Sequence, residues 1–113
     1  MTTLSNRPKP WEVWLAYVRF ADNPKTGKVR PVVMLEGLEA AFVVAKVTSA
    51  APLDHYDYCE LEDWEDEGLL RPSRVQLAPL IRVGVHDLLN GEPIGVLSDR
   101  DKKNLNEGLS KSL

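Results

Sequence analysis

Five polar side chains near the expected ends of neighbouring strands are the best candidates for chemistry: Lys28, Arg30, Thr48, Ser49 and Arg74. An arginine offers a planar, permanently charged fork of donors that matches the oxygens of a phosphodiester. A hydroxyl beside it can donate to a non-bridging oxygen as negative charge develops there. Because RNA supplies its own 2′-hydroxyl nucleophile, Arg30 with Thr48 is the minimum equipment for metal-independent RNA cleavage. An ordinary edge arginine and an ordinary strand-end threonine would give the same pattern.

Other kinds of chemistry find little support in the sequence. His55 and His86 lie far apart with no further ligand at metal-binding spacing, so we expect no metal site. The seven glycines are scattered and form no phosphate-binding loop, so we expect no cofactor. Cys59, on an expected strand, is better explained as a small core residue than as a nucleophile. The carboxylates of residues 60–67 could form a two-carboxylate or divalent-cation site, but they match no calcium loop.

The elements that position Arg30 and Thr48 are predicted to be strands of a meander. Residues 12–20 form an apolar, β-branched and aromatic run without Gly or Pro, typical of a buried strand. Asn-Pro and Thr-Gly signals predict an exposed, partly basic loop over 21–28. Strands follow at 29–36, with Pro31 near its start or an edge, and at 40–49. As one hairpin, these two strands bring Arg30 and Thr48 to the same rim.

The second half of the chain predicts shorter elements and one helix. We expect strands at 57–61, 73–77 and 80–83, and single helical turns at 63–68 and 85–89. Trp64 is expected to anchor the first of these turns. A final helix is capped by Ser98, favoured by Asp99 and Asp101, and carries one apolar stripe: Leu105, Leu109 and Leu113. Short strands followed by one helix predict a small closed or half-open barrel with the helix packed on it.

Length and composition bound the class of protein. The 113 residues predict a single domain, 1–113, with 1–9 as a flexible N-terminal segment, and 43% apolar residues allow a core without disulfides. A single cysteine fits a reducing cytosol, so we expect a cytoplasmic protein. No run approaches the roughly 20 apolar residues of a membrane span, and the N-terminus has no hydrophobic signal core.

The net charge of −3 is unevenly distributed. Residues 1–46 hold seven basic and four acidic residues, 47–70 hold none and eight, and 71–113 hold seven and five. The acidic block is most simply a solvated face, and the rest of the chain is mildly basic. Net acidity therefore does not exclude a nucleic-acid partner.

The order of these pieces resembles the MazF/PemK family of toxins from type II toxin-antitoxin systems. Family members open with an acidic residue and an aliphatic and aromatic strand, continue through a polar loop to Arg-Pro and an apolar strand, and end the next strand in Thr with a second hydroxyl residue. The matching segments here are 11–15, 30–35 and 47–49, followed by 73–77, 80–83 and 94–99. The resemblance covers roughly Lys9 to Leu113. Trp11 replaces a usual glycine, and 77–79 lack an acidic residue that some members carry.

The resemblance implies a mainly β fold, a small SH3-like barrel of the MazF/PemK/CcdB type with a C-terminal helix, usually a homodimer. It implies an endoribonuclease that cuts single-stranded RNA to a 2′,3′-cyclic phosphate and a 5′-hydroxyl, and a cognate antitoxin. The arginine matching Arg30 would act on the phosphate and on proton transfer, and the threonine matching Thr48 would stabilise the transition state. Lys28, Ser49 and Arg74 would help to hold RNA.

Two alternatives remain open from the sequence. One is a non-catalytic barrel that binds a protein partner, either an antitoxin or a gyrase-type target. The other is a degenerate family member that only docks an antitoxin.

Overall fold

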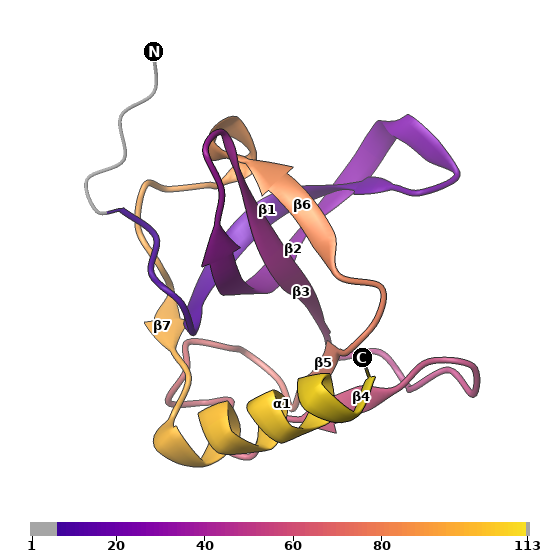
Figure 1. Cartoon of the computed structure of the whole chain (residues 1–113), viewed down its shortest axis with the longest axis vertical. Helices are drawn as coiled ribbons and strands as arrows, with labels where there is room; N and C mark the ends of the chain where they lie inside the picture. The colour runs from indigo at the N-terminus through magenta and orange to yellow at the C-terminus, as the bar shows by residue number, and fades with distance from the viewer. Residues whose placement is uncertain (1–6, 113) are drawn as a thin grey trace.

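The computed structural model describes residues 7–112 and contains seven strands, a 3-10 helix and an α-helix (Figure 1). The elements are β1 (Glu12–Phe20), β2 (Asn23–Gly37), β3 (Ala41–Thr48), β4 (Tyr58–Glu60), β5 (Arg74–Gln76), β6 (Ile81–Gly84), η1 (Val85–Asp87), β7 (Gly95–Val96) and α1 (Asp99–Ser112). All pairs are antiparallel, in the order β4-β5-β3-β2-β1-β7, with β6 also on β3. This confirms the expected mainly β fold with a C-terminal helix.

The hairpin of β1 and β2 differs from the prediction in one respect. β1 has the expected bounds, but β2 begins at Asn23, so the predicted loop over 21–28 is wrong. Val18 pairs with Lys28 and Arg19 with Gly27, and only residues 21–22 remain for the turn. The turn signals misled because β1 continues to Phe20 and offers a partner strand to these residues. The result is an exposed two-stranded arm that extends from the body of the sheet (Figure 1).

Pro31 lies inside β2 at the point where β2 and β3 separate. The carbonyl of Leu15 accepts a hydrogen bond from Leu89 N at 2.9 Å, so it points away from β2. Pro31 is the register partner of Leu15, and its backbone nitrogen therefore faces β3. A proline nitrogen cannot donate a ladder hydrogen bond. The β2–β3 ladder accordingly ends at the pair Val32 and Lys46, next to Pro31.

Beyond that point β3 changes partner. Val47 pairs with Val75 and Thr48 with Arg74, both on β5, while residues 41–44 pair with β6. β3 is thus shared between β2, β5 and β6, which curves the sheet into a half-open barrel. A gap opens between β2 and the last two residues of β3.

Alternating side chains of the sheet build two apolar clusters, one on each face. The first lies between the sheet and α1, and its buried members are Val13, Val33, Ala45, Val47, Leu61, Leu69, Val75, Leu77, Leu97 and Leu105. Trp64 packs against it, as expected of an anchor. The second is covered by β6 and η1, and comprises Trp14, Ala16, Val18, Val32, Met34, Phe42, Val44, Val83 and Leu88.

The remaining elements agree with the sequence to within a residue or two, with one omission. The backbone nitrogen of Asp101 donates to Ser98 Oγ at 3.1 Å, which confirms the helix cap. Leu105 is buried, Leu109 is half-buried, and Leu113 and residues 1–6 lie outside the described residues. The omission is β7, which pairs with Glu12 and Val13. No helix in the described part of the chain is both long and apolar enough to cross a membrane.

Candidate functional site

A pocket of about 420 Å³ lies beside the gap between β2 and β3. Residues from β1, β2 and β3 form one side, and residues 68–71, which follow the acidic turn, form another. The lining includes two arginines and three hydroxyl residues and no acidic side chain: Leu15, Val29, Arg30, Pro31, Val47, Thr48, Ser49, Gly68, Leu69, Leu70, Arg71, Ser73 and Ile94. Its chemistry suits an anion with an apolar portion.

Arg30 and Thr48 both line this pocket. Continuing the register of Val32 and Lys46 by two residues places Arg30 opposite Thr48, but here the strands have separated. The structure thus brings together the two residues that the sequence placed at one rim, although Arg30 lies within a strand and does not begin one.

The polar atoms of Arg30 and Thr48 differ in the hydrogen bonds that they form. Arg30 Nε is buried and has no hydrogen-bond partner among the described residues. Thr48 Oγ1 accepts a hydrogen bond from Ala50 N at 3.1 Å, so its own proton is available to an acceptor. A bound anion would supply the acceptor that both groups need.

The other three predicted residues lie around this pair in different ways. Ser49 is exposed and lines the pocket. Lys28 is exposed on β2, two residues from Arg30, and therefore on the same face of the strand. Arg74 donates through Nε to Glu60 at 2.7 Å and through a terminal nitrogen to the carbonyl of Ala50. These bonds fix the segment that follows Thr48.

Two cationic residues near the site were missed by sequence reasoning. Arg71 is exposed and lines the pocket, but it lies next to Pro72 in a segment without periodicity. Lys46 is half-buried on β3 and lies close enough to Arg30 for their charges to interact. In the sequence, Lys46 is an isolated polar residue within an apolar strand and by itself gives no sign of a function. Its place beside Arg-Pro in the hairpin register was the available signal.

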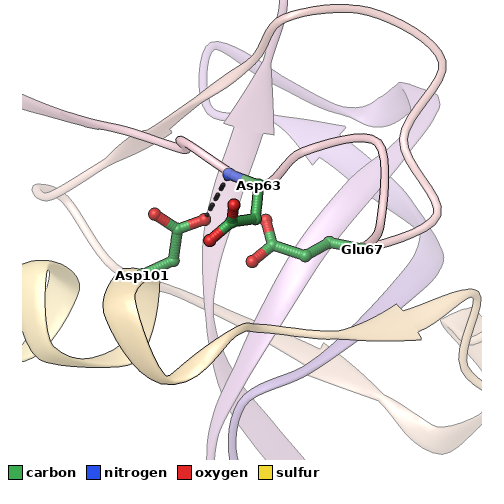
Figure 2. A group of neighbouring side chains, drawn as sticks. All are labelled: Asp63, Glu67 and Asp101. Atoms are coloured by element: carbon green, nitrogen blue, oxygen red, sulfur yellow. Dashed lines mark hydrogen bonds between the residues drawn. The ribbon is translucent and has the colours of Figure 1, made fainter.

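Three carboxylates meet where the turn over residues 62–67 contacts the start of α1: Asp63, Glu67 and Asp101 (Figure 2). One oxygen of each lies within 4.8 Å of the others. Asp101 is fully buried and accepts hydrogen bonds from the backbone nitrogens of Glu62 at 2.9 Å and Asp63 at 3.0 Å. The prediction of the acidic block as a solvated face is therefore wrong for its inner members, because the start of α1 folds back over them.

The donors around these carboxylates favour proton sharing over cation binding. Asp63 accepts from Ser98 Oγ and from Arg100, and Glu67 Oε2 accepts from Ser98 N at 2.8 Å. Glu67 Oε1 is buried without a partner among the described residues. Burial, with the nearby Asp101 carboxylate, raises the pKa of Glu67 to about 7. A protonated Glu67 would donate to its neighbour, and the cluster then ties residues 62–67 to α1.

The raised pKa of Glu67 predicts a pH-dependent stability. Between pH 4.5 and 7 the folded state binds the proton that the unfolded state has lost, so stability should fall as pH rises through this window. The loss should approach about 3 kcal/mol above pH 7. Glu67→Gln should remove that part of the pH dependence, because an amide keeps both the acceptor and the donor. Urea denaturation at pH 5, 6, 7 and 8 measures it.

Glu65→Gln is the matched control, because Glu65 is exposed on the same turn. It should leave the pH profile unchanged. Equal slopes for wild type and Glu67→Gln would contradict the assignment of the buried proton to Glu67.

Comparisons with known proteins give a similarity among solved structures. No protein-family model and no curated protein matches the chain. Among solved structures, the chain is similar to the "Mycobacterium tuberculosis toxin MazF-mt6", with a TM-score of 0.63 and 25% sequence identity. The match covers 89% of this chain and 94% of that one. Over nearly its full length, the chain therefore has the fold of a MazF-like toxin.

Proposed function

We propose that this MazF-like chain is the toxin of a toxin-antitoxin pair and cleaves single-stranded RNA without a metal ion. The observation that carries the proposal is that Arg30 and Thr48 line one pocket where β2 and β3 separate, and that no acidic side chain lines this pocket. The similarity to a solved MazF toxin supports it independently. The products would be a 2′,3′-cyclic phosphate and a 5′-hydroxyl.

In this reaction no covalent bond forms between the protein and the RNA. The 2′-hydroxyl loses its proton, its oxygen bonds to phosphorus, the bond to the 5′-oxygen breaks, and that oxygen takes up a proton. Charge increases on the non-bridging oxygens in the transition state, where the guanidinium of Arg30 and the hydroxyl of Thr48 would donate. The unpartnered Nε of Arg30 means that no internal bond must break first.

Neighbouring groups would hold the RNA strand. Lys28 and Ser49 offer a cation and a hydroxyl on either side of the central pair, and Arg74 would act mainly through the segment 48–50 that it holds. A homodimer in the cytoplasm and a cognate antitoxin that covers the groove are part of the same proposal. An acidic antitoxin segment would satisfy the same unneutralised cations as RNA.

The end chemistry of the products tests this proposal. Purified protein is incubated with single-stranded RNAs of mixed sequence in EDTA, and the new ends are identified by mass spectrometry. We expect cleavage at a recurring sequence, with cyclic phosphate and 5′-hydroxyl ends. Cleavage that requires Mg²⁺ and leaves 5′-phosphates would contradict the mechanism, and intact RNA would contradict the nuclease assignment.

A second function, binding of a protein partner without catalysis, is favoured by the apolar rim of the pocket. Leu70 is 93% exposed and Val29 is 48% exposed, and such side chains more often contact protein than RNA backbone. Expression in a bacterial host followed by sequencing of RNA 5′-hydroxyl ends separates the two functions. Growth arrest without new ends would favour protein binding.

A further inference from the structure

We propose that Lys46 is a second cation of the phosphate site and contacts the scissile phosphodiester together with Arg30. This inference rests on the proposed nuclease function and extends it to a residue that neither the sequence motifs nor the similarity to a known toxin indicated. Two observations support it: the position of Lys46 in the sheet, and the absence of a counter-ion for it among the described residues. The chemistry of a phosphodiester agrees with both.

The register of the sheet places Lys46 on the same side as the proposed catalytic pair. Lys46 pairs with Val32, so it lies diagonally across from Arg30. Arg30 and Val32 share a face of β2, and Lys46 and Thr48 share the corresponding face of β3. The three polar side chains therefore share one face of the sheet near the point where β2 and β3 separate; Arg30 and Thr48 line the pocket, and Lys46 lies next to them outside its lining.

The two cations lie together without an acidic partner. Neither Arg30 nor Lys46 forms an ion pair within the part of the chain that the structure describes, whereas Arg19, Arg74 and Arg100 each do. Burial of the Lys46 stem and the charge of Arg30 both lower the pKa of the Lys46 ammonium. Two half-buried like charges repel each other, and an anion bound between them would relieve that repulsion.

A phosphodiester fits the arrangement better than a free chloride ion. It offers two non-bridging oxygens that can accept from two cations at once, and Thr48 adds a hydroxyl donor on the same face. Phosphorus gains a fifth oxygen during transesterification and the charge on these oxygens increases. Lys46 should therefore contribute to the rate as well as to binding.

The test compares Lys46→Met with Lys46→Arg and uses a probe that cannot be cleaved. The probe is a fluorescent single-stranded DNA oligonucleotide, which carries phosphodiesters but lacks the 2′-hydroxyl. We expect Lys46→Met to weaken binding about tenfold and to reduce the slope of log affinity against log salt by about 1, as for one lost phosphate contact. Lys46→Arg should retain both. In RNA cleavage, kcat/KM of Lys46→Met should fall by about 10²-fold.

Controls separate this role from a structural one. Lys103→Met removes an exposed lysine from α1 and should change neither measurement. Methionine keeps the buried stem of Lys46, so thermal melting should be unchanged; if that variant does not fold, Lys46→Gln replaces it.

Failure of this inference and failure of the nuclease proposal give different results. Wild-type affinity and salt slope in Lys46→Met, or a wild-type protein that binds no oligonucleotide, would overturn the role of Lys46. A wild-type protein that binds the DNA probe through Lys46 but cuts no RNA would support the phosphate site and overturn the nuclease.

Discussion

Arg30→Ala should reduce the rate of RNA cleavage by at least about 10²-fold, because it removes a donor to an oxygen on which charge develops. Little protein structure depends on this side chain, since Nε has no partner among the described residues. Circular dichroism and thermal melting should therefore remain close to wild type. Arg30→Lys should give an intermediate rate, because it keeps the charge but loses the planar fork. Single-turnover cleavage of a short RNA measures the chemical step.

Arg82→Ala is the matched control for this experiment. Arg82 is an exposed arginine on β6 and does not line the pocket, so its loss should leave cleavage within about twofold of wild type. An unchanged rate in Arg30→Ala would overturn the assignment of the site. Equal losses in both variants would point to general charge attraction for RNA and not to a positioned donor.

Strands without internal breakers were predictable from the sequence, and segments whose state depends on a distant partner were not. Residues 12–20 form an apolar, β-branched and aromatic run without Gly or Pro, so local pattern and final structure agree. Residues 23–28 carry two turn signals, yet they belong to β2, and Asn23, Gly27 and Lys28 pair with β1, because an exposed ladder tolerates these residues. β7 has only two residues and exists because Glu12 and Val13 offer a free edge. No local signal encodes that pairing.

The residues of the candidate site also differ in whether the sequence could predict their positions. Arg30 and Thr48 could be placed together because a hairpin needs only local register. In the sequence, Lys46 is a single polar residue in an apolar strand. Its place beside the site follows from Pro31, where the β2–β3 ladder ends. The inner carboxylates were misjudged because Ser98 and Asp101 lie more than 30 residues from the turn that they contact. Charge blocks in a sequence do not show which members fold inward.

Asp101→Ala should destabilise the fold by about 2–5 kcal/mol, more than any surface substitution. Asp101 is fully buried and each of its oxygens accepts a backbone N–H, from Glu62 and from Asp63. Alanine leaves both donors without a partner in a part-buried position, next to Glu67. Asp101→Asn should also be harmful, because an amide NH₂ would face one of the two donors. The midpoint of urea unfolding, with the slope checked for constancy, measures the change.

Asp99→Asn is the control, because Asp99 lies on the same helical turn and its side chain is exposed. Its effect should stay within about 0.5 kcal/mol, whereas equal effects at the two positions would show that only helix-dipole charge matters.

The loss of Asp101 should also affect function, since residues 62–67 lead directly into residues 68–71 of the pocket wall. If Asp101 holds that wall, its loss should raise KM for RNA under conditions where the protein remains folded, while Arg30 and Thr48 on the opposite wall keep kcat close to wild type.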